Sequence, residues 1–304
     1  MKRSRIPLTG SAQRAKGRQS LPFLVGGAMQ SFGILNITAD SFSDGGHFLA
    51  PEAALSRARA LFAEGADVLD LGGASSAPNA LPVSPELEIA RLASVVDAFQ
   101  DDAHRLSIDS FATAVQRWAL TRNVGYLNDI QGFADPAFYP ELAGSSCRLI
   151  VMHSVQGHGP ARPMFVPAAE IYDRVCRFFE RRLCALIQAG IHADRLILDP
   201  GMGMFLGSDP EASFVMLRQI GALRAAFGRP VLISVSRKSF LRQLVKAEPR
   251  AAGPASLAAE LFALAGGADF VRTHDVAALR DAAKVWQRLE RPHAATAPGM
   301  ANDL

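Results

Sequence analysis

The sequence predicts an α/β fold, a (β/α)8 TIM barrel, from two observations. Eight short apolar runs rich in β-branched residues recur along the chain, and each is followed by Gly, Asn, Asp or Ser. Between them lie segments with helical periodicity, several of which end in Gly. Strands separated by single helices pair in parallel through right-handed crossovers, and eight such units close into a barrel. An open, doubly wound sheet is the competing architecture.

The strand interiors are apolar, as strands covered on both faces require. In chain order, the expected strands are 32–38, 68–73, 105–109, 125–130, 148–154, 196–203, 231–237 and 270–275. Helical candidates between them include 51–65, 115–123, 172–190 and 254–267. Because the sequence shows no internal repeat and no linker, we expect one barrel domain over residues 29–290.

The two ends differ from this body. We expect residues 1–28 to form a flexible basic arm and residues 291–304 a disordered tail. Residues 1–20 carry six basic side chains and no acid, so a formal net charge of +3 for the whole chain leaves about −3 for the rest. That balance argues against a nucleic-acid-binding body. The start imitates a signal peptide, but Pro22 and the glycine pair at 26–27 favour entry into a strand, and Met29 is an alternative start.

Cysteine usage and hydropathy indicate the compartment. Cys147, Cys176 and Cys184 are too few and too irregularly spaced for a disulfide framework or a zinc knuckle. No apolar run reaches the roughly 18 residues that a membrane span needs. We therefore expect a cytoplasmic protein with no membrane or nucleic-acid partner.

Polar residues gather where the expected strands end. In a TIM barrel these carboxyl ends and the loops after them build the active site. A single Asp at such a place is readily explained as a helix cap, but eight units that repeat the pattern are not. The residues are Asn36, Asp70, Asp109, Asn128, Asp129, His153, Asp199, Ser236 to Ser239, Arg272 and His274.

Eight ordered motifs at these ends resemble those of the dihydropteroate synthase family over residues 32–290. They are GILNITADSFSDGG (33–46), GADVLDLGGASSAPNA (65–80), SIDS (107–110), LNDI (127–130), MH (152–153), LDPGMG (198–203), SVSRKSF (234–240) and RTHD (272–275). The resemblance implies a pterin-binding TIM barrel that condenses 6-hydroxymethyl-7,8-dihydropterin diphosphate with p-aminobenzoate in folate biosynthesis.

Within that family the chain is most similar to the sulfonamide-insensitive Sul-type synthases. Its sixth loop, 203–208, is longer than usual and carries Met204 where Sul-type sequences commonly have Phe. The Arg that the family usually places in the second loop is absent, because Ala77 stands there. The resemblance implies reduced sulfonamide sensitivity.

The resemblance also implies a pterin subsite. The ring presents a pair of donors that a buried carboxylate answers, and Asp199 matches this position with Asn128 beside it. Lys238 would donate to the ring carbonyl and N5, and Met152 would lie over the ring. Asp109 would stabilise the positive charge that grows as diphosphate leaves. Asp109, Lys238 and Asn36 are the expected catalytic residues.

The remaining expected residues serve the two other groups. Asn36, Arg272 and His274 match the family's diphosphate site, with Mg²⁺ as cofactor bound through Asn36. For p-aminobenzoate, we expect Ser239 to bind the carboxylate. Apolar or small side chains would line its ring: Ser76, Pro78, Met204 and Phe205.

Four alternatives remain open. A pterin- or folate-binding barrel without turnover is kept open by the missing second-loop Arg. A methyltetrahydrofolate-dependent methyltransferase would need the aspartates but has no use for SRKS and RTHD together. A Schiff-base lyase through Lys238 and a zinc hydrolase through His153 are weaker. The late apolar segment 254–267 permits a homodimer.

Overall fold

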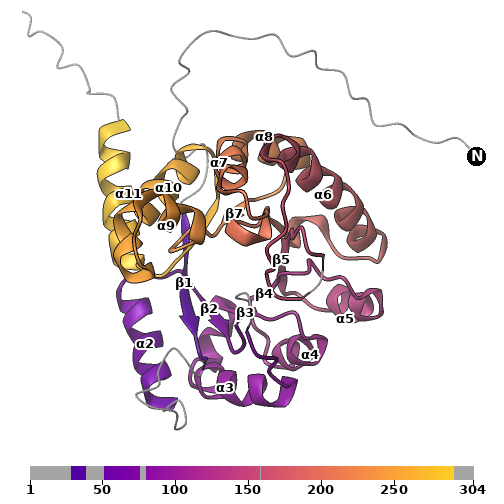
Figure 1. Cartoon of the computed structure of the whole chain (residues 1–304). Helices are drawn as coiled ribbons and strands as arrows, with labels where there is room; N and C mark the ends of the chain where they lie inside the picture. Colours follow the sequence, from indigo (N-terminus) through magenta and orange to yellow (C-terminus); the bar gives the residue numbers. More distant parts are fainter. Residues whose placement is uncertain (1–28, 39–50, 76–79, 158, 291–304) are drawn as a thin grey trace, which may run out of the picture.

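The structure, a computed structural model, describes residues 29–38, 51–75, 80–157 and 159–290, and these form a barrel of parallel strands ringed by helices (Figure 1). The expected arm 1–28 and tail 291–304 lie outside the described residues. The strands are β1 Gln30–Asn36, β2 Val68–Gly72, β3 Leu106–Asp109, β4 Tyr126–Asp129, β5 Arg148–Met152, β6 Leu196–Asp199, β7 Leu232–Ile233 and β8 Phe270–Thr273.

The sheet runs in the order β6-β5-β4-β3-β2-β1-β8-β7, and every pairing within it is parallel. Its two end strands meet through one bridge between Leu198 and Val231, and the Leu198 N–H donates to the Pro230 carbonyl at 2.9 Å. This contact nearly closes the barrel. The TIM-barrel prediction is confirmed, and the open-sheet alternative is wrong.

Helices follow the strands in turn. They are α2 Pro51–Ala63, α3 Pro85–Ala98, α4 Thr113–Thr121, α5 Tyr139–Gly144, α6 Ile171–Gln188, α7 Pro210–Arg218, α8 Ile220–Phe227, α9 Ser239–Val245, α10 Gly253–Ala265 and α11 Val276–Glu290. Ser84 and Asp209 cap α3 and α7 by accepting backbone N–H groups, and each is followed by a Pro that starts the helix. None of the described helices combines the length and apolar character that a membrane crossing requires.

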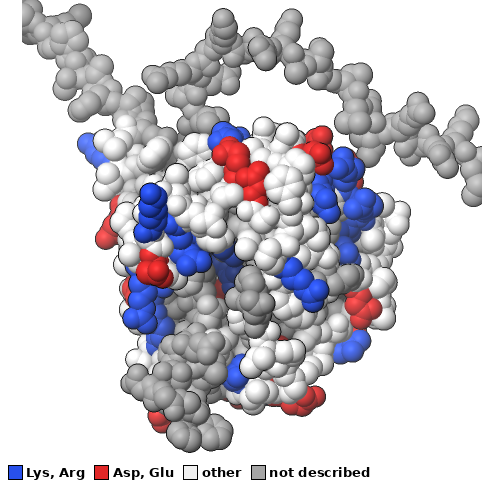
Figure 2. All heavy atoms as spheres, in the orientation of Figure 1, with Lys and Arg blue, Asp and Glu red and all other residues white. Residues whose placement is uncertain are grey.

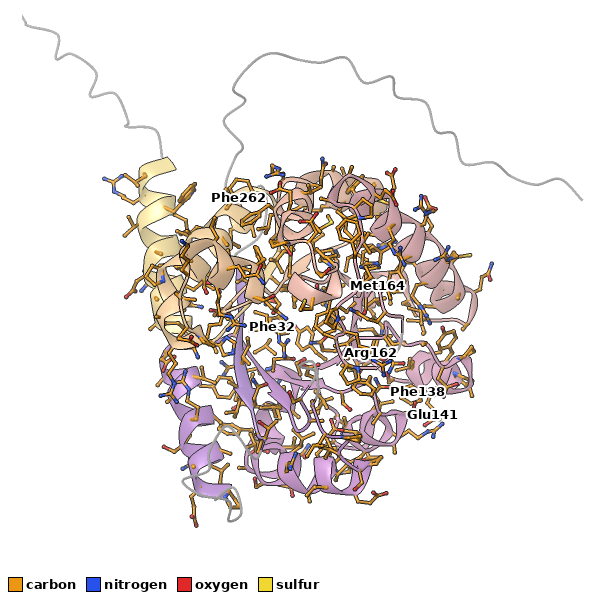
Figure 3. The ribbon with its side chains drawn as sticks, viewed as in Figure 1. Phe32, Phe138, Glu141, Arg162, Met164 and Phe262 are labelled. Carbon is orange, nitrogen blue, oxygen red and sulfur yellow. The ribbon has the colours of Figure 1, made fainter. Side chains whose placement is uncertain are left out.

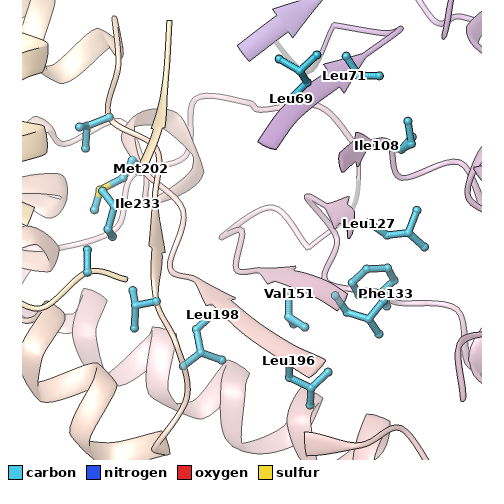
Figure 4. Close-up of a cluster of buried hydrophobic side chains, with 14 of the residues drawn as sticks. Leu69, Leu71, Ile108, Leu127, Phe133, Val151, Leu196, Leu198, Met202 and Ile233 are labelled. Atoms are coloured by element: carbon cyan, nitrogen blue, oxygen red, sulfur yellow. The ribbon is translucent and has the colours of Figure 1, made fainter. Parts of the chain in front are cut away.

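Alternation along the strands separates two apolar layers, because residues two apart in a strand face the same side. The side chains that face the helices pack into the large core, part of which Figure 4 shows with Leu69, Leu127 and Leu198. The inward side chains of seven strands form a separate plug: Phe32, Val68, Tyr126, Ile150, Ile197, Leu232 and Phe270. The Phe32 ring, at the centre of the barrel in Figure 3, meets the rings of Tyr126 and Phe270 edge-on, with centroids 5.1 and 5.7 Å away.

Two residues beyond this plug, the inward positions become mostly polar. Phe32 is followed by Ile34, but the other strands place here Asp70, Asn128, Met152, Asp199, Ser234 and Arg272. Two residues further along the chain from Ile34, Ser234 and Arg272 lie Asn36, Ser236 and His274. The plug therefore closes one end of the barrel and sets a layer of polar side chains at the other.

Candidate active site

A cavity of about 510 Å³ opens above this polar layer. Eight of the residues expected in the site line it: Asn36, Asp109, Met204, Phe205, Lys238, Ser239, Arg272 and His274. Figure 2 shows Lys and Arg atoms in the hollow near the middle of this face. The structure thus brings together side chains from β1, β3, β8 and the loops after β6 and β7. Ser76 and Pro78 lie outside the described residues.

The three other expected residues, Asn128, Met152 and Asp199, do not line the cavity but are buried in the layer beneath it. Asn128 pairs with Asp109 in the sheet, and Met152 pairs with Asp199. Within the described part of the chain, Asn128 Oδ1 is buried with no hydrogen-bond partner. A buried, unpaired acceptor is costly, so this atom is suited to a ligand that brings an N–H group.

Arg272 crosses the layer from β8 and forms ion pairs with two carboxylates. Its Nε faces Asp70 on β2, and its Nη2 donates to Asp109 on β3. Asp70 is fully buried and also accepts a hydrogen bond of 2.5 Å from the Ser107 hydroxyl. Burial raises the pKa of Asp70, against the lowering effect of Arg272. The sequence placed Asp70 at a strand end but gave it no role, and its partner could not be predicted.

Asp199 and Lys238 lie near each other, and their pKa values shift in opposite directions. Burial raises the pKa of Asp199 to about 6, although the Gly201 N–H donates to Oδ1 at 2.8 Å and Lys238 opposes the rise. Burial, aided by repulsion from Arg272, lowers the pKa of Lys238 to about 8. Desolvation is the main cause of both pKa shifts. A ligand that hydrogen-bonds to either group would therefore stabilise its charged form.

The loop after β7 aims Lys238 and Ser239 into the cavity through a strained residue. Arg237 adopts a left-handed conformation with φ of 60°, which a residue other than glycine rarely does. Its backbone N–H donates to Ser256 Oγ at 2.9 Å, which holds the turn. Arg242, one turn into α9, also lines the cavity, and its Nε is buried with no partner among the described residues.

The loop after β6 forms an apolar wall. Met204 and Phe205 lie in a short 3₁₀ turn, and Phe205 packs with Met152. The Gln156 side chain donates to the Met204 carbonyl at 2.8 Å and fixes the turn. Position 201 in this loop requires glycine, because its φ is 74° and a Cβ there would lie 2.5 Å from the His153 carbonyl oxygen. Lys238 Nζ lies 5.2 Å from the Phe205 ring centroid.

His274 and Asn36, from the ends of β8 and β1, also line the cavity. His274 Nδ1 lies 3.0 Å from Ser236 Oγ. Burial, and then the positive charge of Arg237 and Arg272, lowers the pKa of His274 to about 3. The imidazole is therefore neutral at neutral pH. Asn36 is exposed at the end of β1.

Two other polar residues support the loops. His153 Nδ1 donates to the Pro200 carbonyl at 3.0 Å, so Nδ1 carries the ring proton. Asp129 accepts hydrogen bonds from the Gln116 side chain and from the backbone N–H groups of Gln131 and Phe133. Within the described ranges, no three His, Cys, Asp or Glu side chains are grouped to hold a metal ion. The zinc-hydrolase alternative gains no support from this geometry.

Comparison with known proteins gives consistent results. The family model described as "Pterin binding enzyme" matches residues 32–274. The chain is 57% identical over 259 residues to dihydropteroate synthase type-2 of Escherichia coli, a match that covers 85% of this chain and 95% of that one. It is 53% identical over 252 residues to the type-1 enzyme of Pseudomonas aeruginosa, covering 83% and 90%.

Solved structures agree. The dihydropteroate synthase of Xanthomonas albilineans with 4-aminobenzoic acid superposes with a TM-score of 0.78 at 35% identity, covering 86% of this chain and 93% of that one. The same organism's enzyme in complex with 7,8-dihydropteroate gives a TM-score of 0.74 at 34% identity, covering 86% and 94%.

Proposed function

Because the chain belongs to the dihydropteroate synthase family, we propose that it condenses 6-hydroxymethyl-7,8-dihydropterin diphosphate with p-aminobenzoate to give 7,8-dihydropteroate and diphosphate. The observation that carries the proposal is the buried pair of Asp199 and Asn128 beneath a cavity lined by basic side chains. A carboxylate and an unpaired amide oxygen can accept hydrogen bonds from the donors along the pterin edge. Lys238 donates hydrogen bonds to the acceptors of the ring.

The substrates react across the cavity. The ionised Asp199 accepts from the pterin ring, Lys238 donates to its carbonyl and N5, and Met152 packs against its face. Asp109 lies near the methylene carbon, where its negative charge stabilises the cation that develops as the C–O bond to diphosphate breaks. The amine of p-aminobenzoate then forms the C–N bond and releases a proton.

Asn36, Arg272 and His274 bind the diphosphate. Asn36 is an exposed residue that lines the cavity. Its side-chain oxygen would suit Mg²⁺, which prefers oxygen ligands and takes few from protein when phosphates supply the others. When bound, the ion would neutralise charge on the leaving group. Arg272 forms ion pairs with Asp70 and Asp109 and so holds these carboxylates in place. Its positive charge also attracts the diphosphate.

Ser239 binds the carboxylate of p-aminobenzoate, and Met204 and Phe205 line its ring, with Ser76 and Pro78 from the second loop. Arg242 supplies the positive charge that the second loop lacks at Ala77. Its position in the cavity wall and its unpaired, buried Nε support this assignment. The longer sixth loop narrows the pocket beyond the carboxylate, where sulfonamides are bulkier than the substrate. A clash there reduces sulfonamide sensitivity.

The proposal extends to assembly and location. Exposed apolar side chains on the last two helices support a homodimer: Phe262 on α10, and Val285 and Leu289 on α11, are all at least half exposed. Figure 3 labels Phe262 among the outer helices. We place the reaction in the cytoplasm. Light scattering that gives a monomer mass at micromolar concentration would refute the dimer.

Turnover tests the reaction. Purified protein, Mg²⁺, the pterin diphosphate and labelled p-aminobenzoate should yield labelled dihydropteroate. Binding of the pterin without product would instead identify a barrel that has lost turnover. Drug sensitivity is tested by comparing the sulfamethoxazole concentration that halves turnover with that for a sulfonamide-sensitive dihydropteroate synthase, and equal values would refute reduced sensitivity.

A further inference from the structure

The apolar wall of the cavity is built from two loops. The loop after β6 supplies Met204 and Phe205, and the loop after β5 supplies Ala161, which is 3% exposed. Ala161 and Phe205 belong to one apolar cluster with Met152. Because β5 ends at Met152, well before Ala161, the ladder hydrogen bonds of the sheet do not fix this part of the wall. Contacts between the two loops must do so.

The two loops pair through their backbones at two points. The Val155 N–H donates to the Phe205 carbonyl at 3.0 Å, and the Ser208 N–H donates to the Met164 carbonyl at 2.8 Å. Met164 is labelled in Figure 3, as is Arg162 of the same loop. These contacts align the loops but leave the backbone next to Met204 and Ala161 to be held by a side chain.

The side chain of Gln156 supplies that link. Its Nε2 donates to the Met204 carbonyl at 2.8 Å and to the Arg162 carbonyl at 2.7 Å. An amide nitrogen carries two protons, so one proton goes to each loop. Arg162 follows Ala161 directly, and the single amide group therefore holds the backbone on both sides of the wall.

Ser154 orients this amide group. Its hydroxyl donates to Gln156 Oε1 at 2.5 Å and accepts the backbone N–H of Gln156 at 3.3 Å. The orientation is determined by the partners, because the two carbonyl oxygens can only accept and so must face Nε2. Gln156 is not among the described residues that line the cavity. It can act on a ligand only through the wall that it holds.

We propose that Gln156 is a positioning residue that sets the discrimination between p-aminobenzoate and sulfonamides, because it joins the two loops that form the wall. A wall excludes a bulkier ligand only if moving it costs free energy, and each net hydrogen bond contributes roughly a fivefold factor to that equilibrium. The inference rests on the proposed function, which places the p-aminobenzoate ring against Met204 and Phe205. Gln156 takes no part in bond making.

The test is Gln156→Met, which keeps an unbranched side chain of similar length but donates no hydrogen bond. The quantity measured is the inhibition constant of sulfamethoxazole divided by KM for p-aminobenzoate. We expect this ratio to fall about fivefold, with KM for the pterin substrate unchanged. A merely structural role would lower kcat through the folded fraction and leave the ratio as it is.

Gln100→Met is the matched control. The Gln100 Nε2 also donates to a backbone carbonyl, that of Arg122 at 3.0 Å, and neither residue is among those described in the cavity wall. The control should keep the wild-type ratio. If Gln156→Met does not fold, Ser154→Ala decides, because it removes the hydroxyl that orients the amide group and should shift the ratio in the same direction by less.

Amide hydrogen exchange of residues 203–208 gives a reading that needs no turnover. Exchange there should be faster in Gln156→Met than in the wild type or in Gln100→Met. An unchanged ratio or unchanged exchange in the folded Gln156 variant would overturn the inference, as would an unchanged ratio in Ser154→Ala where that variant decides. A wild type without turnover would defeat the proposed function, and hydrogen exchange would still decide whether Gln156 holds the wall.

Discussion

Replacing Arg272 by Met should destabilise the protein by about 3–5 kcal/mol at pH 8, the usual cost of breaking a buried ion pair by removal of one partner. The Arg272 side chain is 13% exposed, and the side chains of its partners Asp70 and Asp109 are 0% and 16% exposed. The substitution keeps the length of the stem but leaves both carboxylates without their cation in a desolvated layer.

The loss should depend on pH in one direction. Burial holds the folded-state pKa of Asp70 above its value in the unfolded chain, and Arg272 opposes this rise. Without Arg272 the folded-state pKa rises further, so the folded variant binds a proton at pH values where the unfolded chain has released it. Stability then falls as pH rises above the unfolded value of about 4. The destabilisation relative to wild type should therefore be smaller at pH 5 than at pH 8.

Urea unfolding followed by the fluorescence of Trp118 and Trp286 measures this difference. The control is Arg224→Met, whose pair with Asp269 lies at the surface with the Arg side chain 48% exposed. It should cost under about 1 kcal/mol. If Arg272→Met loses the same free energy at pH 5 as at pH 8, or no more than the control, Arg272 is not the cation on which these carboxylates depend.

Four further outcomes are expected. Pterin affinity, measured by calorimetry, should be nearly constant between about pH 6 and pH 8, where Asp199 is ionised and Lys238 is protonated, and fall roughly tenfold per pH unit below pH 6; Asp199→Asn should abolish the dependence below pH 6 together with tight binding. Arg242→Met should raise KM for p-aminobenzoate about tenfold with little change in KM for the pterin substrate. Met204→Ala should open the wall and lower the sulfamethoxazole concentration that halves turnover roughly threefold or more. Removing Mg²⁺ with EDTA should lower turnover reversibly.

The sequence predicted the eight strands because a polar residue interrupts most of the apolar runs, although some expected ranges, such as 32–38 and 196–203, run past the observed strand ends. Asn36 and Asp109 each interrupt an apolar run at the residue where the structure ends the strand. The seventh strand shows the limit of this reasoning. Residues 231–237 were expected to be extended, but the ladder holds only Leu232–Ile233. The chain leaves the sheet at Ser234 to make the left-handed turn at Arg237, and a local apolar pattern contains no signal for that turn.

The division of the expected site into two levels was also beyond the sequence. Asn128 and Asp199 lie two residues past Tyr126 and Ile197 of the plug, and they are buried and do not line the cavity. Asp109 reaches the cavity itself. Depth depends on strand register across the barrel, and a one-residue change of register would turn these side chains towards the helices. Sequence spacing fixes which face a residue shares with its neighbours along one strand, but not its height relative to another strand.

Protonation states are harder still to predict from the sequence, because they depend on how deeply each group is buried. Lys238 and Asp199 are oppositely charged neighbours, and attraction alone would strengthen the charge on both. Instead desolvation shifts each pKa towards neutrality, to about 8 and about 6. The empty site therefore holds ionisable groups close to their titration points, where a bound pterin that hydrogen-bonds to both can restore full charge. The same reasoning makes His274 a neutral base, because burial and the surrounding cations lower its pKa to about 3.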